Sequence, residues 1–342
     1  MGEVNRGRLT RRLGQVVSAV GMLAIHGCGG HSPVTPTPVP PGPPTITCPA
    51  PIQALAHNGT APAVTFDVPA GQGGQSPVTT ACTPAPGGQF QLGTTAVTCT
   101  ATDALGQTGT CSFNVDVSPV AVISLTKFMA FGDSLTAGIT SPAPTLLMLD
   151  VPDSYPSQLL TMLSGRYLDQ TITMANEGLP GSKAVDDVGR FADAMRADQP
   201  EVVLLLEGAN DLNAYGDDGI NGALGALEDM IKEGNARGAQ VFLATLPPQN
   251  PDGKNGHSAG LVPQLNRGIA ATAADEGATL VDLYGKMGTF VGYIGVDGLH
   301  PTPVGYEKIA EIWRDAIEAK LEKPAAAPPQ MVLPTARTAR KR

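Results

Sequence analysis

Five residues far apart in the chain have the types that acyl transfer to a serine requires. Ser134 lies in the stretch FGDSLTAG, Gly178 in NEGLPG, Asn210 in EGANDL, and Asp297 and His300 in DGLHPTPVGY. A serine hydroxyl is a weak nucleophile at neutral pH unless a base takes its proton as it attacks. Histidine titrates in the right range, and a carboxylate can orient its ring and stabilise the imidazolium. Waiting N–H donors can then stabilise the negative oxygen of the tetrahedral intermediate.

Each of these residues has an ordinary structural alternative when it is taken alone. Ser134 could cap a helix, Asn210 could lie in a turn, and His300 could be a surface histidine. The catalytic interpretation therefore depends on all of them meeting at one place. Asp133 and Asp211 are predicted to have structural roles in the neighbouring turns.

The elements that must position these residues alternate between strand and helix patterns from about Val120 onward. The predicted strands are residues 127–131, 171–175, 202–207, 241–246 and 279–283. The clearest helical patterns cover residues 155–167, 222–238 and 262–277. Apolar strands that alternate with helices predict a parallel sheet covered on both faces. In such sheets, ligands bind beyond the carboxyl ends of the strands.

Polar, glycine-bearing turns follow the first three predicted strands, at residues 132–134, 176–178 and 208–211. A fourth such segment lies beyond the fifth strand and ends in Thr302 and Pro303, which are suited to start a helix. Asp297 and His300 precede this helix and are three residues apart. If that segment forms one turn, the carboxylate can bond one ring nitrogen and leave the other facing Ser134.

Residues of roughly 126–320 resemble the SGNH/GDSL hydrolase family through the four motifs quoted above. The resemblance implies a flavodoxin-like, three-layer α/β domain with a five-stranded parallel sheet. It also implies a catalytic triad of Ser134, His300 and Asp297. The implied oxyanion hole consists of the Ser134 amide, the Gly178 amide and the Asn210 side chain. No metal and no cofactor is implied.

Residues 45–118 have a different character, with abundant Val and Thr in short alternating runs and no Lys or Arg. This pattern predicts a β-sandwich of about seven short strands, including a hairpin over residues 95–117 with its turn at 104–107. The segment resembles the HYR (hyalin repeat) family through TITCPAPI, AVTFDVPA and GGQFQLGTTAVTCTATDALGQTGTCSFNV. The resemblance implies an immunoglobulin-like spacer or adhesion module that could contact carbohydrate or protein.

The start of the chain has the features of an export signal. Residues 1–27 contain four arginines followed by an apolar stretch, and the sequence IHGC ending at Cys28 is similar to a bacterial lipobox. The predicted product is a lipoprotein anchored in the periplasm or at the cell surface, with membrane contact only through a lipid on Cys28. An ordinary cleaved signal and a secreted, soluble product remain the alternative. Residues 28–44 are proline-rich and are predicted to form an extended tether.

The cysteine count agrees with this interpretation. If Cys28 carries a lipid, four cysteines remain, and they all lie in the β segment: Cys48, Cys82, Cys99 and Cys111. Export makes two disulfides plausible, and three pairings are open.

The chain of 342 residues carries 22 Lys and Arg against 31 Asp and Glu, and only 4% of its residues are aromatic. Both facts argue against nucleic acid as a partner. We therefore predict a hydrolase domain at residues 119–323, followed by a disordered tail at 324–342. The preferred function is an exported esterase for short-chain acyl or acetyl esters. The alternatives are a carbohydrate O-deacetylase, a lysophospholipase or thioesterase, and a non-catalytic adhesion protein.

Residues 138–154, which contain the apolar run Leu146–Leu149, and the predicted loop at residues 247–260 are candidates to shape the substrate pocket. For the apolar run, a helix packed beside the sheet is the equal alternative.

Overall fold

The computed structural model describes residues 39–143 and 146–324. The predicted signal peptide (1–27) and Cys28 lie outside these residues, as do most of the tether (28–44) and nearly all of the tail (324–342). The described chain has two separate sets of buried apolar side chains, one in an all-β region and one in an α/β region. Each region therefore has a core of its own.

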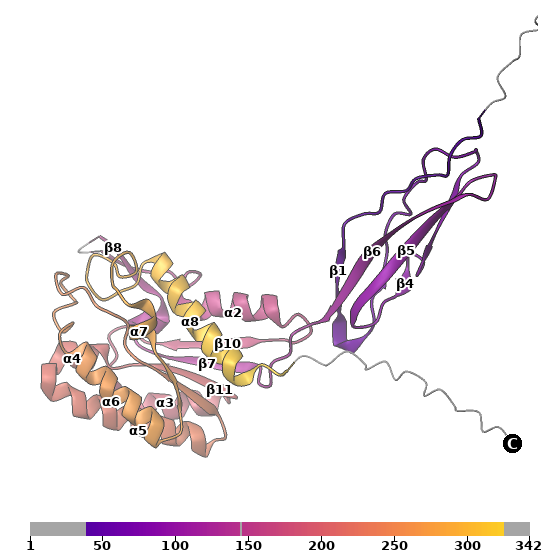
Figure 1. Cartoon of the computed structure of the whole chain (residues 1–342). Helices are drawn as coiled ribbons and strands as arrows, with labels where there is room; N and C mark the ends of the chain where they lie inside the picture. The colour runs from indigo at the N-terminus through magenta and orange to yellow at the C-terminus, as the bar shows by residue number, and fades with distance from the viewer. Residues whose placement is uncertain (1–38, 144–145, 325–342) are drawn as a thin grey trace, which may run out of the picture. The chain divides into compact units, whose positions relative to one another are not determined.

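The all-β region contains six strands in its described residues, rather than about seven (Figure 1). They are β1 (Ile52–Ala56), β2 (Ala63–Val64), β3 (Thr79–Thr83), β4 (Gly88–Gln89), β5 (Gly93–Thr102) and β6 (Thr108–Pro119), and a 3₁₀ turn, η1 (His57–Gly59), follows β1. Four of them form a sheet in the order β1-β6-β5-β3, and β2 pairs with β4.

The predicted hairpin is confirmed, since β5 and β6 pair antiparallel and join through residues 103–107. Asp103 fixes this turn by accepting hydrogen bonds from the amides of Leu105 and Gln107. The four cysteines form two disulfides, Cys48–Cys111 and Cys82–Cys99.

We expect both disulfides to stabilise the β region. In the loop-entropy model, removing Cys48–Cys111, which closes a 63-residue separation, costs about 4 kcal/mol. Removing Cys82–Cys99, with a separation of 17, costs about 3 kcal/mol. Paired Cys→Ala variants of the full chain, unfolded thermally and followed by far-ultraviolet circular dichroism, measure these losses.

The fluorescence of Trp313 provides an internal control, because this single tryptophan lies in the α/β region. Its fluorescence transition is expected to stay unchanged in both variants. A shift of that transition, or an unchanged β-region transition, would contradict the expectation.

The α/β region is built on a five-stranded, all-parallel sheet in the order β10-β7-β11-β12-β13. The strands are β7 (Lys127–Gly132), β10 (Thr173–Gly178), β11 (Val202–Leu206), β12 (Gln240–Ala244) and β13 (Thr279–Val281). This order is that of a flavodoxin-like sheet, so the predicted fold class is confirmed. The second strand begins two residues later than predicted, at Thr173, and extends to Gly178.

Helices cover both faces of this sheet (Figure 1). Helices α2 (Tyr155–Arg166) and α8 (Pro303–Leu321) pack together on one face. Helices α3 (Ala184–Asp198), α5 (Gly219–Ala236) and α6 (Val262–Asp275) pack on the other. Shorter helical segments are α1 (Ser134–Ala137), α4 (Ala209–Tyr215), η2 (Gly216–Asp218) and α7 (Leu283–Met287). The result is the predicted three-layer architecture.

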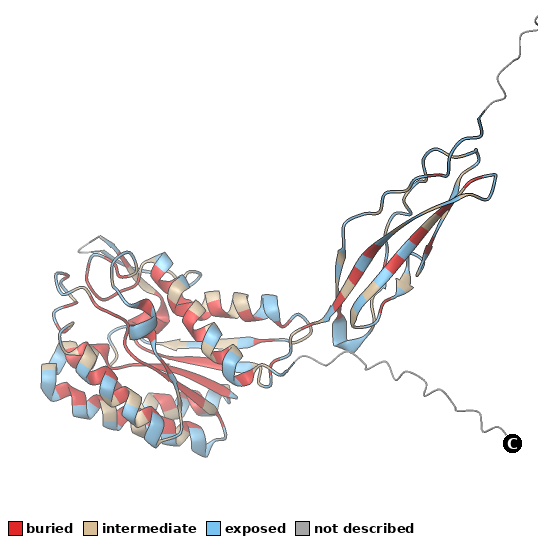
Figure 2. Cartoon of the chain, viewed as in Figure 1, coloured by how far each residue is buried: buried red, intermediate tan, exposed pale blue. Residues whose placement is uncertain are grey.

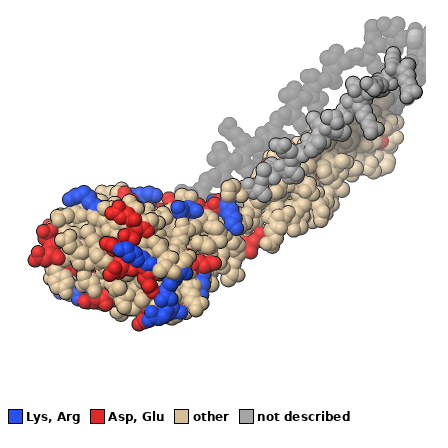
Figure 3. Space-filling model, turned by 90° about the horizontal axis from the view of Figure 1, so that it is seen from below, with Lys and Arg blue, Asp and Glu red and all other residues tan. Residues whose placement is uncertain are grey.

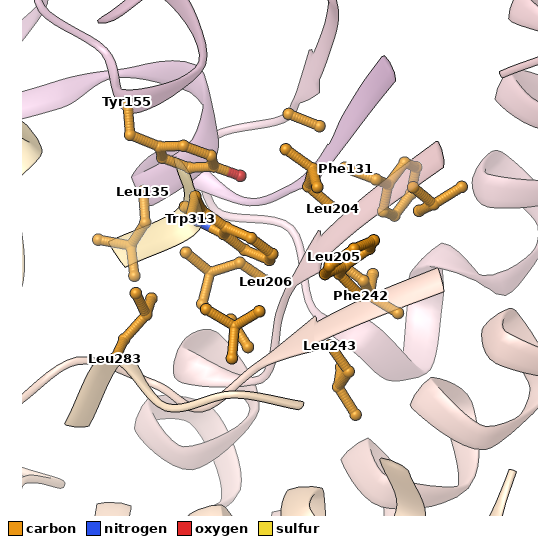
Figure 4. Close-up of a cluster of buried hydrophobic side chains, with 14 of the residues drawn as sticks. Phe131, Leu135, Tyr155, Leu204, Leu205, Leu206, Phe242, Leu243, Leu283 and Trp313 are labelled. Carbon is orange, nitrogen blue, oxygen red and sulfur yellow. The ribbon is translucent and has the colours of Figure 1, made fainter. Parts of the chain in front are cut away.

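The central strands are buried on both faces, which explains their continuous apolar sequences (Figure 2). Phe131 of β7 packs edge-on against Phe191 of α3, with 5.0 Å between the ring centroids. On the other face, Tyr155 of α2 and Trp313 of α8 stack at 6.0 Å (Figure 4). These contacts fix the helices against the sheet whose edge carries the polar turns.

The parallel register brings three of the polar turns side by side. Gly132, the last residue of β7, is the register partner of Gly178 in β10 and of Leu206 in β11. The segments that continue from these strands therefore start from one edge of the sheet.

The apolar run Leu146–Leu149 is not helical. It forms strand β9, which pairs antiparallel with β8 (Ile139–Ala143), and its four side chains are about half exposed. The alternative of a helix in the core is therefore wrong. Four consecutive apolar residues are too few to show whether burial follows the period of a helix or that of a strand.

Charges of both signs are interspersed over the α/β region on the face shown in Figure 3. Within residues 39–143 and 146–324, none of the helices combines the length and the apolar character that crossing a membrane requires.

Candidate active site

The nucleophile candidate Ser134 is the first residue of α1, directly after β7. The Asp133 side chain caps this short helix by accepting a hydrogen bond from the Leu135 amide. A Cβ added at Gly132 would lie 2.2 Å from Thr136 Oγ1 and 2.4 Å from the Leu206 carbonyl. Glycine at this position therefore lets α1 and the end of β11 approach β7 closely, next to Ser134.

The structure brings Ser134, His300 and Asp297 together. His300 Nε2 lies 2.9 Å from Ser134 Oγ, and His300 Nδ1 lies 2.5 Å from Asp297 Oδ2. All three residues are buried. A 166-residue separation in sequence is thus closed by the parallel sheet and by the segment that leads into α8.

The turn between Asp297 and His300 has the geometry that their spacing predicts. Asp297 Oδ1 accepts hydrogen bonds from the amides of Leu299 and His300, while Oδ2 faces the imidazole. The N-cap of the following helix is Thr302, whose hydroxyl accepts a hydrogen bond from the Gly305 amide. One carboxylate therefore shapes the turn and orients the ring.

Asp297 is held in its ionised form. Burial alone would raise its pKa, but hydrogen bonds from His300 and from Asn255 Nδ2, at 2.8 Å, outweigh this and lower the pKa to about 2. An ionised carboxylate cannot donate, so the proton between the two residues belongs on His300 Nδ1. The lone pair of Nε2 is then free to accept the Ser134 hydroxyl proton.

Two of the candidate oxyanion donors lie in elements beside Ser134: Gly178 is the last residue of β10, and Asn210 is in the first turn of α4. The Gly178 amide donates to Asn176 Oδ1 at 3.0 Å, and Asn210 Nδ2 donates to Ser182 O at 2.7 Å and to Asp133 Oδ2 at 3.1 Å. Both donors are therefore held by protein acceptors, and each can serve a substrate oxygen only by sharing or leaving its present acceptor.

The packing of β10 against α1 requires glycine at position 178. An added Cβ would lie 2.1 Å from the Ala137 nitrogen and 2.6 Å from the Ala137 Cα, inside the backbone of α1. Glycine at this position thus lets β10 approach the helix that carries Ser134.

Replacing Gly178 with alanine is expected to destabilise the α/β region by about 3 kcal/mol and to lower activity, because rigid backbone atoms must move. Urea unfolding followed by Trp313 fluorescence measures the loss. Gly189→Ala is the matched control, because no atom lies within 4 Å of its added Cβ and the position is inside α3. We expect the control to be neutral or slightly stabilising; equal stability of the two variants would contradict the packing explanation.

Asp133 and Asp211 make structural contacts in their turns, as predicted. Asp211 accepts hydrogen bonds from the amides of Ala184 and Val185 and so holds the start of α3. Asp133 is buried beside the site, and this burial raises its pKa to about 7, although the Leu135 amide and the charge of His300 act in the opposite direction.

A pocket of about 330 Å³ opens over Ser134 and His300. Its apolar lining comes from Ile139, Leu147, Pro180 and Leu299, and its polar lining includes Asn210, Asn213, Asn255 and His257. Leu147 belongs to the exposed strand β9, and Asn255 and His257 belong to the predicted loop at residues 247–260. Both segments that the sequence singled out therefore contribute to this pocket.

Sequence reasoning missed two residues that hold the site. Asn255 bonds Asp297, and Tyr306 of α8 donates to the Ile139 carbonyl at 2.6 Å. Neither lies at a spacing that points to Ser134 or His300. His257 also has partners that were not foreseen, since its ring nitrogens lie 3.4 Å from Lys254 O and 3.3 Å from Asn213 O.

Across the part of the chain that the structure describes, no three His, Cys, Asp or Glu side chains are grouped so that they could hold a metal ion.

Comparison with known families finds two matches along the chain. Residues 130–308 match the GDSL-like Lipase/Acylhydrolase family, and residues 41–117 match the HYR domain. The first match contains Ser134, Gly178, Asn210, Asp297 and His300. The second match contains all four disulfide-bonded cysteines.

A protein named multidomain esterase, from Ruminococcus flavefaciens, is 31% identical over 172 residues, which are 49% of this chain and 22% of that protein. The chain therefore spans about a fifth of this relative's length. Among solved structures, the lipase/acylhydrolase from Enterococcus faecalis aligns with a TM-score of 0.50 and 24% identity, over 59% of this chain and 100% of that chain. A catalytic mutant of an acetylxylan esterase from Geobacillus stearothermophilus aligns with a TM-score of 0.47 and 18% identity, over 57% of this chain and 95% of that chain.

Proposed function

Because the chain belongs to the GDSL-like lipase/acylhydrolase family, we propose that it hydrolyses carboxylic esters through an acyl-enzyme formed on Ser134. The observation that carries this proposal is the chain of two contacts from Ser134 Oγ to His300 Nε2, and from His300 Nδ1 to Asp297 Oδ2. With Asp297 ionised, this is the protonation pattern that a serine nucleophile needs.

In the first half of the reaction, His300 takes the Ser134 proton as Oγ attacks the ester carbonyl carbon. The Asp297 carboxylate stabilises the imidazolium that forms. His300 then gives the proton to the departing alkoxide. The alcohol leaves, and the acyl group stays bound to Ser134. In the second half, His300 takes a proton from a water molecule as the water oxygen attacks the acyl carbon. The bond between that carbon and Ser134 Oγ then breaks, His300 returns the proton to Oγ, and the acid is released.

The Ser134 amide, the Gly178 amide and the Asn210 side chain are proposed to stabilise the tetrahedral oxygen. Removing one such donor typically costs 10²–10³-fold in kcat. When the oxygen becomes negative, it competes well against the neutral oxygens of Asn176 and Ser182 that now accept from Gly178 and Asn210, because hydrogen bonds to charged oxygens are about twice as strong. The second acceptor of the Asn210 amide, Asp133 Oδ2, is a carboxylate oxygen and is the stronger competitor.

The preferred substrates are esters with a short acyl group, acetyl included. The pocket supports this choice by its moderate size and by its polar lining of Asn213, Asn255 and His257, which suits a hydroxyl-bearing alcohol group. The same lining supports the second candidate, an O-deacetylase acting on carbohydrate. The multidomain esterase of R. flavefaciens adds support for ester hydrolysis in either case.

A series of nitrophenyl esters from acetyl to dodecanoyl, run beside acetylated xylan, tests the substrate choice. We expect kcat/KM to be highest for acetyl to butyryl esters and to fall for longer chains. Acetate release from xylan that outpaces every simple ester would favour the deacetylase. A maximum at dodecanoyl would favour a lysophospholipase-like activity instead.

The remaining parts of the chain are proposed to place this esterase outside the cell. Supporting features are the basic and apolar start of the chain, the lipobox-like IHGC and the two disulfides. We propose that Cys28 carries a lipid anchor and that the HYR domain serves as a spacer that can also contact carbohydrate or protein. Metabolic labelling with a tagged palmitate, lost in Cys28→Ser, tests the anchor; export of an unlabelled, soluble protein would favour simple secretion.

A further inference from the structure

A half-buried arginine of α3, Arg190, lies at the carboxyl ends of β10 and β7, next to the proposed oxyanion donors. Its guanidinium carbon lies 3.9 Å from the centroid of the Phe131 ring. Its two terminal nitrogens donate to two backbone carbonyls: Nη1 to Glu177 O at 2.7 Å and Nη2 to Gly132 O at 3.1 Å. One planar group thus joins the carboxyl ends of β10 and β7.

These two carbonyls belong to the peptide units that precede the site residues. The peptide group is planar and trans, so the direction of the Glu177 carbonyl fixes the direction of the Gly178 N–H. In the same way, the Gly132 carbonyl fixes the peptide that leads into Asp133 and Ser134. Arg190 therefore controls the orientation of one donor directly and the start of the nucleophile turn as well.

The third donor is linked to the same arginine through Asp187. The Asp187 carboxylate contacts both Arg190 Nη2 and the Ser182 hydroxyl. The carbonyl of Ser182 accepts the hydrogen bond from Asn210 Nδ2 at 2.7 Å. The position of the Asn210 amide therefore depends on a loop that the Arg190–Asp187 pair holds.

Nearby charges explain why an arginine can stay in this place. Asp187 is 4% exposed and Glu207 is fully buried, with Glu207 Oε1 3.6 Å from Arg190 Nη2. Burial alone would raise the pKa of Asp187, but hydrogen bonds from Arg190 and Ser182 outweigh it and leave that pKa lowered. For Glu207, burial raises the pKa well above its usual value. The main partner of the arginine charge is therefore Asp187.

We propose that Arg190 is a positioning residue that sets the geometry of the oxyanion hole from behind, through the Glu177 and Gly132 carbonyls and through Asp187 and Ser182. The proposal rests on the proposed serine-esterase function. It differs from a purely structural role, which would affect stability without a selective effect on the transition state.

The test compares Arg190→Lys with wild type and with Arg196→Lys in the full chain. Lysine keeps the charge but is a single point donor that cannot bond both carbonyls. Arg196 lies on the same helix, is 55% exposed on its side chain and pairs with Asp193, so its variant is the matched control. kcat and KM for nitrophenyl acetate are measured per active site, titrated with a fluorophosphonate.

We expect Arg190→Lys to lower kcat by about 10²-fold with KM within threefold of wild type, because one or two oxyanion donors are displaced. The loss is expected to be smaller when Arg190→Lys is added to Asn210→Ala, because the part that acts through Ser182 and Asn210 is already lost while the part that acts through the Gly178 amide remains. Arg196→Lys is expected to match wild type. A kcat within threefold of wild type for Arg190→Lys, or fully multiplicative effects in the double variant, overturns the proposal.

Two further arms keep the result interpretable. If Arg190→Lys does not fold, Asp187→Asn removes the carboxylate that joins Arg190 to Ser182 and leaves both carbonyl acceptors of Arg190 in place. A kcat loss of about tenfold at unchanged KM then supports the proposal, and unchanged kcat overturns it. Measurements on the wild-type protein distinguish a failure of the proposed esterase function from a failure of the role given to Arg190. No ester hydrolysis by wild type, or hydrolysis that survives Ser134→Ala, defeats the proposed function itself, whereas an active, Ser134-dependent enzyme with a normal Arg190→Lys variant defeats only this inference.

Discussion

Replacing Ser134 with alanine is expected to lower kcat/KM for ester hydrolysis on the order of 10⁶-fold, the scale seen when a serine nucleophile is removed. The Ser134 hydroxyl contacts His300 Nε2 at 2.9 Å and is the group aimed at the pocket from the turn after β7. The variant keeps the backbone of α1, because Asp133 rather than Ser134 caps that helix. Loss of activity should therefore occur without loss of the fold.

The measurement is a progress curve for nitrophenyl acetate, with Trp313 fluorescence as the check on folding. Ser164→Ala is the matched control, since Ser164 is exposed on α2. We expect the control to retain full activity. More than about 1% of wild-type kcat/KM in a pure preparation of Ser134→Ala would show that another group performs the attack.

Replacing Asp297 with asparagine is expected to lower kcat by about 10⁴-fold. Asn255 Nδ2 and His300 Nδ1 both point toward Asp297 Oδ2 as donors. An amide nitrogen placed there would meet donors instead of acceptors. If the amide donates to Nδ1, the imidazole proton moves to Nε2, and the ring can no longer accept the Ser134 proton.

The pH dependence gives a second criterion for this variant. In wild type, the pKa of Asp297 is lowered to about 2, so the carboxylate is ionised throughout the range from pH 5 to pH 9. The defect of Asp297→Asn is therefore expected to be nearly constant over that range. Asp252→Asn, an exposed change in the loop that also carries Asn255, is the control and should behave as wild type. A variant within tenfold of wild type at any pH in this range would contradict the role given to Asp297.

The same linkage affects stability. Asp297 has a lower pKa in the folded protein than in the unfolded chain, where it is about 3.9. Its ionisation stabilises the fold above that unfolded value, and the contribution is lost as the pH falls toward 2. Between pH 5 and pH 3 the advantage of wild type over Asp297→Asn should therefore shrink by about 1 kcal/mol. Urea unfolding at the two pH values measures this difference.

The sequence was sufficient for the parts of the fold that depend on local patterns. Continuous apolar runs identified β7, β11 and β12, because a strand buried on both faces has apolar residues at nearly every position. The rule that sites lie at strand ends then placed Ser134 and Gly178 together, and the register of β7 with β10 confirms their adjacency. The three-residue spacing of Asp297 and His300 was enough to predict that the Asp297 carboxylate bonds the His300 ring.

Features that depend on tertiary contacts could not be predicted from the sequence. Cys99 lies opposite Cys82 on one side and opposite Cys111 on the other, so even the correct hairpin did not determine the disulfide pairing. The contact between Asn255 and Asp297 arises from the path of a long loop, which no periodicity describes. Arg190 reaches the sheet edge from the middle of α3, where its sequence position resembles that of any charged residue on an amphipathic helix.

The most direct test of the mechanism is to trap the covalent intermediate. The enzyme is mixed with a slowly deacylated nitrophenyl ester, quenched in acid within milliseconds, digested and analysed by mass spectrometry. We expect one acyl group on the peptide that contains Ser134, formed together with a burst of nitrophenol equal to the enzyme concentration and absent in His300→Ala. Steady hydrolysis with no acyl adduct on Ser134, or an adduct on a different residue that turns over at the rate of the reaction, would contradict serine-based catalysis at this site.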